Sequence, residues 1–565
     1  MKHLYSFISL FIFVSLTHIS LRGDYLYLLS QEKTSQDGYV FVYDTDRLGA
    51  IINNSQIPPT YHLAQIGVGK NPVHMILSKD QKHLFVLSQD GIRVIYTPTL
   101  SLAFTIDAAY MNNKTGLTLG SFPQNKLYLS EKYHDFDSST LFFAYQDASN
   151  TNYVIKLIVS LPPYPDCSMN KVSIGNRIVQ DMIDSPIGLL LVGCTNTVPS
   201  SRNLISIHLD ASNGIKIKDE DNFNPSFPIY SISANANSTL LYFNPNLATS
   251  SGIKTTPLTK LTNIPLFNSN PGDISFTNFS GKYVSKFILS PKVIDNTSTI
   301  YSYGFGKSPY PNSGGVLLCP EAPTTSFIVS SSSVGLTGLC FSKDGRYIFA
   351  SEGYDPMGLY NLTYMFDTSS GNGNFTKIRT LKAALPCTLK SPLNVYLSNT
   401  EGGKFNEAGS QIFFPYATSS ITPLEGFCMF KMTDILSGSS SSPIDPSFVQ
   451  SNPSYNSIGV LLGKVFLEAP VISVTKIGNY HQINLVTPSQ SPTTVKYAIY
   501  KRSFPSTKTQ NYVSSETKLI GFISPSGIPY LKDYFTSGET NYYYAVSQDP
   551  SGNQGALSQP ISITS

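Results

Sequence analysis

The sequence predicts an all-β protein in which a strand–turn–strand unit recurs along most of the chain. The clearest copy, FSKDGRYIFASEG, spans residues 341–353; LSKDQKHLFVLSQ spans residues 77–89 and SFPQNKLYLSEK spans residues 121–132. The composition agrees, because 35 Tyr, 33 Phe, 39 Gly and 37 Pro with only 13% charged residues suit short strands joined by turns. Such a unit at intervals of tens of residues is typical of radial or solenoid β architectures.

Apolar strands in the same phase as LFVLS extend the repeat to eight units. They are expected at residues 25–30, 83–88, 126–131, 189–193, 240–244, 299–304, 347–352 and 411–416. Each unit is expected as an inner strand, a turn, a long second strand, a third strand and a weaker fourth, which predicts a seven- or eight-bladed β-propeller over residues 24–467. The first unit lacks an inner strand. We expect the apolar run at residues 458–467 to supply it, so that the chain ends close the ring and protect its edges.

The segment NPVHMILSKDQKHLFVLS, residues 71–88, resembles the blades of bacterial YVTN and lactonase-like β-propellers. In those proteins a Pro-x-His or Pro-x-Gly step precedes an apolar strand and an SPDG turn. The chain departs from the lactonase pattern where an Arg often precedes the matching His, because Val73 stands there. It departs again at Ser88-Gln89, where Asn-Glu often ends the next strand. The resemblance therefore implies the fold and not the activity.

Residues 468–565 are predicted to form a second domain, a small antiparallel β-sandwich. Short alternating strands are expected at residues 471–478, 481–488, 495–503, 518–524, 530–535 and 540–564. The run TNYYYAVSQDPSGNQG, residues 540–555, resembles a fibronectin type III domain, in which an aromatic strand precedes a turn containing Asp and Gly-Asn. That family usually has a Trp in its second strand, and this chain has none. Strand alternation predicts a core of Ile483, Leu485, Tyr497, Ile499, Tyr543 and Ala545.

Residues 1–23 resemble a secretory signal peptide, with Lys2 before an apolar run from Leu4 to Leu16. An uncleaved anchor is the alternative, and no later stretch is apolar enough to be predicted as a membrane span. We therefore expect a secreted, periplasmic or cell-surface protein. The formal charge of +3 is spread along the chain, so nucleic acid is not an expected partner. Export permits disulfides, and six cysteines allow fifteen full pairings, although Cys340 could equally be a buried free thiol.

Four polar residues recur where strands of the repeat end: Gln31, Gln89, Glu131 and Glu352 each follow a Ser. If the units keep one register, these side chains lie at one rim and are candidate ligands for a polar molecule or a sugar. The simpler interpretation is that they face solvent at strand ends. Glu131, Glu352 and His74, which is expected on an inner strand, are also the candidate acids and bases of an enzyme. The simpler interpretation of His74 is a half-buried side chain that hydrogen-bonds a neighbouring blade.

The remaining motifs point away from catalysis. Asp80 and Asp344 are expected to stabilise turns. No metal and no cofactor is expected, because no Cys/His cluster has zinc spacing and no Gly-rich phosphate loop or nucleophile elbow occurs. Without a convergent catalytic set, the favoured function is a secreted or cell-surface binding or adhesion protein whose propeller loops engage a protein or glycan partner. The alternative is an exported propeller hydrolase or lyase that acts on a carbohydrate or lactone.

Overall fold

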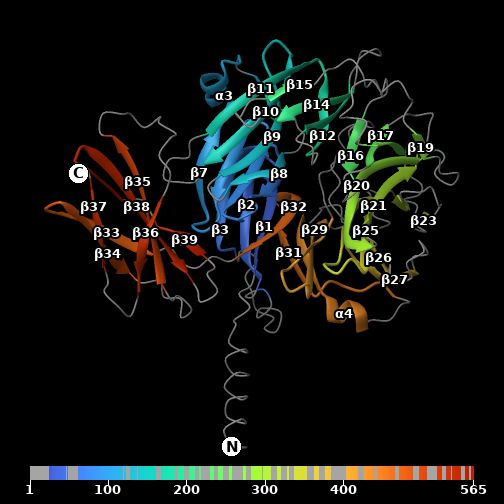
Figure 1. Ribbon diagram of the computed structural model, residues 1–565. Helices are drawn as coiled ribbons and strands as arrows, with labels where there is room; N and C mark the ends of the chain where they lie inside the picture. The colour runs from blue at the N-terminus through green and yellow to red at the C-terminus, as the bar shows by residue number, and fades with distance from the viewer. Residues whose placement is uncertain are drawn as a thin grey trace, which may run out of the picture.

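The part of the chain that the structure describes folds mostly into β-strands (Figure 1). The computed structural model describes residues 24–45, 48, 62–118, 120–122, 127–135, 138–160, 167–184, 189–195, 203–209, 215–217, 229–234, 240–245, 253–257, 272–274, 282–294, 297–306, 315–319, 327–329, 336–352, 362–367, 376–383, 402–417, 425–437, 442–452, 454–464, 470–487, 496–505, 518–524, 530–535, 537–548, 554–558 and 561–564. The expected signal peptide lies outside these residues.

Within the described residues, strands β1 to β32 form eight four-stranded antiparallel sheets that follow one another along the chain. The first sheet contains β1 (Asp24–Glu32), β2 (Asp37–Asp44), β3 (Ala64–Lys70) and β32 (Tyr455–Lys464). The second contains β4 (Pro72–Leu77), β5 (His83–Ser88), β6 (Gly91–Tyr96) and β7 (Ser101–Ile106). The third contains β8 (Tyr128–Asp135), β9 (Ser138–Gln146), β10 (Asn152–Ser160) and β11 (Cys167–Gly175). The fourth contains β12 (Ile178–Asp184), β13 (Leu189–Thr195), β14 (Leu204–Leu209) and β15 (Ile215–Ile217).

The other four sheets repeat the same strand order. The fifth contains β16 (Ile229–Ala234), β17 (Leu240–Pro245), β18 (Ile253–Pro257) and β19 (Gly272–Ile274). The sixth contains β20 (Lys282–Ile294), β21 (Thr297–Gly306), β22 (Gly315–Cys319) and β23 (Phe327–Val329). The seventh contains β24 (Leu336–Phe341), β25 (Tyr347–Glu352), β26 (Thr363–Asp367) and β27 (Thr376–Leu381). The eighth contains β28 (Lys404–Phe405), β29 (Gln411–Ala417), β30 (Glu425–Lys431) and β31 (Phe448–Asn452).

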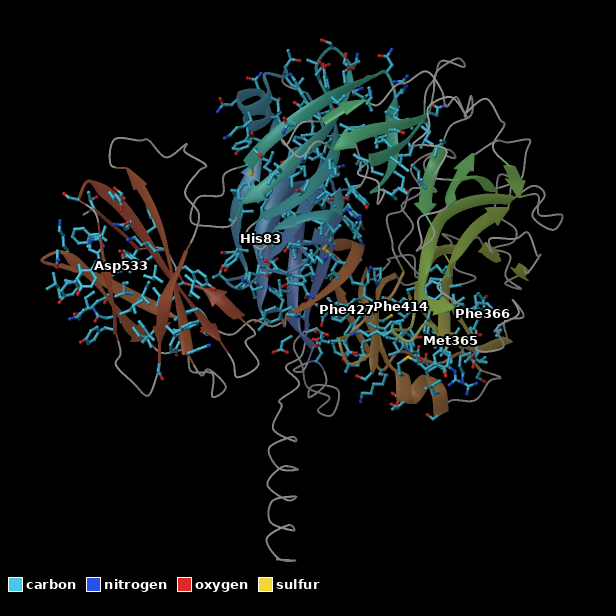
Figure 2. The ribbon with its side chains drawn as sticks, viewed as in Figure 1. His83, Met365, Phe366, Phe414, Phe427 and Asp533 are labelled. Atoms are coloured by element: carbon cyan, nitrogen blue, oxygen red, sulfur yellow. The ribbon has the colours of Figure 1, made fainter. Side chains whose placement is uncertain are left out.

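The first sheet joins the two ends of this region, as the sequence predicts. Strand β32 pairs with β1 in antiparallel register, with Leu28 opposite Val460, and takes the place of the missing inner strand. The core supports the same order, because the large buried clusters lie between neighbouring sheets. The ring centroids of Tyr43 in the first sheet and Phe427 in the eighth lie 4.9 Å apart, with the rings edge to face. Phe427 is labelled in Figure 2. Sheets that pack face to face in chain order, with the last against the first, are arranged as a β-propeller.

The third unit is out of phase with the prediction. The segment at residues 126–131 is expected as a second strand, but β8 is the first strand of its sheet and β9 is the second. The cause is an insertion after β7, where helix α3 (Ala108–Thr115) occupies part of the connection. This helix begins after Asp107, whose carboxylate accepts a hydrogen bond from the Tyr110 backbone N–H at 2.8 Å. A second short helix, α4 (Met432–Ser437), follows β30.

Two turns of the repeat share the same hydrogen bonds. Ser342 Oγ donates to Asp344 Oδ1, which also accepts from the Arg346 backbone N–H at 3.1 Å, and the Tyr347 backbone N–H donates to Ser342 Oγ at 2.9 Å. The turn between β4 and β5 has the same three bonds, made by Ser78, Asp80, Lys82 and His83. Asp80 and Asp344 therefore stabilise turns, as predicted from the sequence.

Strands β33 to β40 form a separate group, drawn in orange and red in Figure 1. The strands are β33 (Val471–Ile477), β34 (Tyr480–Thr487), β35 (Lys496–Pro505), β36 (Lys518–Ile523), β37 (Tyr530–Tyr534), β38 (Glu539–Gln548), β39 (Gln554–Leu557) and β40 (Ile561–Thr564). One sheet has the order β33-β34-β37, and the other has the order β36-β35-β38-β39, with β40 also paired to β38. All six predicted core residues lie in one apolar cluster, Leu485 at its partly buried edge.

Four of the six cysteines are buried and form no disulfide: Cys167, Cys194, Cys340 and Cys428. Burial raises the pKa of Cys194 and of Cys340 to about 12, which keeps both thiols protonated at neutral pH. In the part of the chain that the structure describes, no helix is both long and apolar enough to cross a membrane.

Candidate functional site

The inner strands of the sheets share a β-bulge. It occurs in the second, fourth, fifth, sixth and seventh sheets and where β32 meets β1. A bulge redirects the side chains that follow it, so one position after each bulge is repeated around the inner edges of the sheets. That position is occupied by His74, Asp181, Ser231, Lys286, Gly338 and Gly459.

Two side chains at this repeated position hydrogen-bond the next sheet. His74 is buried, and its Nδ1 accepts a hydrogen bond from the Leu127 backbone N–H at 3.3 Å, just before β8. Asp181 is also buried, and its Oδ2 accepts from the Ile232 backbone N–H on β16 at 3.0 Å. His74 is therefore buried, where the sequence suggested a half-buried side chain, and it hydrogen-bonds a backbone group just before the third sheet.

Glycine occupies the same position in the seventh, eighth and first sheets. Gly338 lies four residues before the turn residue Ser342, and Gly402 lies four residues before Asn406, which makes the matching turn bonds in the eighth sheet. Gly459 is the third, on β32. A Cβ added to Gly459 would meet no atom within 4 Å, so the glycine leaves open space beside the inner strand.

A pocket occupies the space beside this glycine. We call it the axial pocket; it is a small cavity of about 20 Å³, enough for one or two water-sized groups. Leu29, Val73, Ile458 and Pro415 are among its apolar lining, with Gly402 and Gly459, and His74 is its one ionisable lining residue. Small-molecule and side-chain sites commonly have this composition, an apolar wall with few polar groups.

A cluster of carboxamides lies at the same end of these strands. Gln31 Nε2 donates to Asn71 Oδ1 at 2.6 Å, and Asn71 Nδ2 donates to Gln89 Oε1 at 2.6 Å and to Gln36 Oε1 at 3.3 Å. Gln31 follows the pocket residue Leu29 by two positions on β1, about 7 Å along the strand, and Asn71 lies in the bend two residues before the pocket residue Val73. We call Gln31, Gln36, Asn71 and Gln89 the amide rim.

An ion pair extends the amide rim. Arg93 Nη2 binds Asp90 Oδ2 at 3.0 Å, and Asp90 Oδ1 accepts from the Lys70 backbone N–H at 3.3 Å. The other guanidinium nitrogen, Arg93 Nη1, is buried and has no hydrogen-bond partner. A buried donor without an acceptor is costly, which marks this position as one that an acceptor oxygen would satisfy.

The structure brings together two of the four predicted ligand residues. Gln31 and Gln89 meet through Asn71. Glu352 ends β25 in the seventh sheet, opposite Leu336. Glu131 is wrongly grouped with them, because it lies within β8, an inner strand, and not at the end of a second strand. The side chains of Glu131 and Glu352 are outside what the structure describes.

Two of the serines that precede these predicted residues have a structural role instead. Ser88 is buried and its hydroxyl donates to the Val68 carbonyl at 2.5 Å, and Ser351 is buried and accepts from Thr363 Oγ1 at 2.8 Å. Sequence reasoning missed Asn71, Arg93 and Gly459. The sequence signal for Asn71 is the Asn-Pro pair that it forms with Pro72, which is typical of a turn. In the structure Asn71 has a φ of 46°, a conformation that Asn adopts more readily than most residues.

The chemistry of this site is recognition by neutral hydrogen-bonding groups beside an apolar pocket. Amides both donate and accept, so the amide rim can bind uncharged polar groups, and Arg93 offers one charged donor. Among the described residues, no group of three or more His, Cys, Asp or Glu side chains could hold a metal ion.

No protein-family model matches the chain, and no curated protein matches its sequence. Several solved structures align with most of it. They include dihydro-heme d1 dehydrogenase NirN, with a TM-score of 0.48, 11% identity and coverage of 77% of this chain and 74% of that one. A putative 6-phosphogluconolactonase from Bacteroides uniformis aligns with a TM-score of 0.37, 9% identity and coverage of 78% and 99%. A protein from Lactobacillus plantarum aligns with a TM-score of 0.40, 10% identity and coverage of 65% and 97%. Likeness at this level carries no argument about activity.

Proposed function

We propose that this chain is an exported binding protein that engages a protein or glycan partner at the amide rim and the axial pocket. The observation that carries the proposal is the link from Gln31 through Asn71 to Gln89, in which Gln31 and Asn71 each lie two residues from a residue that lines an apolar pocket. Neutral amides suit the hydroxyls of a glycan or the peptide groups of a protein, and the pocket suits one apolar group beside them.

We also propose a number of blades for the propeller and a type for the C-terminal domain. We infer that residues 24–467 form an eight-bladed propeller, supported by the pairing of β32 with β1 and by the packing of the eighth sheet on the first. We infer that residues 468–565 form a fibronectin type III-like domain, supported by the division of its strands into β33-β34-β37 and β36-β35-β38-β39. The sandwich would act as a spacer or adhesion module.

Export rests on the N-terminal sequence. Lys2 and the apolar run from Leu4 to Leu16 support a signal peptide over residues 1–23, and hence a secreted, periplasmic or cell-surface location. N-terminal sequencing of the mature protein tests this, and a mature chain that begins at Met1 would contradict it.

Binding is favoured over hydrolysis by the positions of the candidate catalytic residues. His74 Nδ1 is engaged by the Leu127 backbone N–H, which gives this side chain a role between sheets. Glu131 lies on β8, the first strand of the third sheet, and Glu352 lies on β25, the second strand of the seventh sheet. A paired acid and base needs a shared reacting atom within hydrogen-bond reach of both.

The proposal is tested by probing the full chain against a glycan array and a peptide array. Gln31→Ala and Gln89→Ala are expected to weaken binding of the selected ligand about tenfold, the effect of about 1.4 kcal/mol of lost hydrogen bonding. Gln65→Ala is the matched control, because Gln65 is exposed on the outer strand β3. Equal binding by all three variants would refute the site. Turnover of a lactone or glycoside that His74→Ala abolishes in a folded chain would instead support the enzyme.

A further inference from the structure

The C-terminal sandwich contains a polar network that joins its two sheets. His481 on β34 and Tyr543 on β38 are both fully buried, with His481 Nδ1 at 2.7 Å from Tyr543 Oη. Tyr543 Oη lies 2.5 Å from Asp533 Oδ2 on β37. Asp533 Oδ2 also forms an ion pair with Lys501 Nζ on β35, at 2.7 Å. His481 and Asp533 belong to one sheet, and Tyr543 and Lys501 belong to the other. All three of these interactions therefore cross the sandwich.

The hydrogen bonds determine the tautomer of His481. A tyrosine hydroxyl has one proton, and Tyr543 donates it to the Asp533 carboxylate. Its oxygen must then accept from His481, so Nδ1 carries the imidazole proton and Nε2 carries the lone pair. His481 Nε2 is buried and has no hydrogen-bond partner. The network is therefore complete with neutral imidazole and has no acceptor for a second N–H.

The surroundings of His481 contain charges of both signs. Asp533 pairs with it across β34 and β37, Lys501 reaches the network from β35, and Lys476 approaches from β33. The ring of Phe535 stacks on the imidazole at 4.2 Å, and Lys476 Nζ lies 5.1 Å from that ring. Burial lowers the pKa of His481 below its usual value; Asp533 opposes this effect, and the two lysines reinforce it.

We propose that His481 makes the C-terminal sandwich sensitive to mild acid. Protonation adds an N–H at Nε2, which has no acceptor, and places a second cation near Lys501 and Lys476. Because the folded state disfavours the imidazolium, the unfolded state binds more protons below its own pKa of about 6.5. The stability from neutral His481 is complete above that pH and is lost as the pH falls toward the lower pKa of the folded state. This proposal concerns the sandwich alone and does not depend on the binding site.

The proposal is tested by amide hydrogen exchange of the full chain at pH 7.5 and pH 5.5, corrected for intrinsic exchange rates. Peptides from β34 and β38 are expected to lose up to about tenfold in protection at pH 5.5. His481→Asn is the comparison, since its side-chain amide keeps a donor near Nδ1 and does not titrate. It should show the same protection at both pH values; a wild-type loss that persists in His481→Asn, or no wild-type loss, would overturn the proposal.

A second measurement needs no variant. Exchange of the imidazole C2 hydrogen, followed by mass spectrometry, reports the pKa of each histidine in the intact chain. His481 is expected to titrate below pH 6.5. A value at or above 6.5 would overturn the proposal even if the His481→Asn chain did not fold.

Discussion

Val460→Ala tests the packing of β32, the strand that completes the first sheet. Val460 is 4% exposed and packs in the cluster that joins the first sheet to the eighth, with Leu26, Phe413 and Phe427. The change removes two methyl groups, worth about 0.8 kcal/mol each, and leaves a cavity that costs roughly 1 kcal/mol more. The free energy of unfolding should therefore fall by about 2.5 kcal/mol. Chemical denaturation followed by circular dichroism measures it in a chain without Trp.

The matched control is Val449→Ala, at the second residue of β31. Val449 is 41% exposed, so the same substitution should change the free energy of unfolding by less than about 0.5 kcal/mol. If Val460→Ala lowered the free energy of unfolding no more than Val449→Ala does, β32 would not be packed between β1 and the eighth sheet as the structure has it.

Three further predictions address the turn, a buried histidine and the thiols. Ser342→Ala removes the hydroxyl that bonds Asp344 and the Tyr347 N–H, and should lower the free energy of unfolding by about 1–2 kcal/mol in the same assay; an unchanged value would show that the turn does not need it. Burial lowers the pKa of His83 (Figure 2) to about 4. The contribution of neutral His83 to the free energy of unfolding is therefore fully present above pH 6.5 and is lost as the pH falls toward 4. His83→Phe should flatten the fall in Tm between pH 7 and 5, and a fall as steep as wild type would contradict this role. The thiols of Cys194 and Cys340 should resist iodoacetamide at pH 8 until the chain unfolds, and labelling of the native chain at the rate of a free thiol would disprove their burial.

Much of the fold could be predicted because strands of one sheet are close in sequence. The turn Ser-x-Asp and the apolar strand after it identify the first and second strands together, as at Ser78 and Ser342. The pairing of β32 with β1 was also predictable, because the first unit has no inner strand of its own. The phase of the third unit was not, because α3 lengthens the connection after β7 and the segment before β8 carries no Asp to fix the turn.

The site was less predictable than the fold, since it depends on contacts between neighbouring sheets. Repeated strand ends indicated Gln31 and Gln89, but the residue that joins them, Asn71, belongs to the connection between two sheets. Gly459 has no side chain, so its contribution is space that only the packed structure shows. Glu131 was misplaced for the same reason that the third unit was out of phase.

The most direct measurement of the proposed site is binding by Gly459→Leu to the array ligand that the wild-type chain selects. A Cβ at Gly459 meets no atom within 4 Å, and the glycine lines the axial pocket, so a leucine side chain there should block the pocket. Gly67→Leu is the control, because a Cβ there also meets no atom within 4 Å but the residue lies on the outer strand β3. With the Tm of both variants near wild type, we predict at least about tenfold weaker binding for Gly459→Leu alone. Wild-type affinity in a folded Gly459→Leu chain would show that the partner does not use the axial pocket.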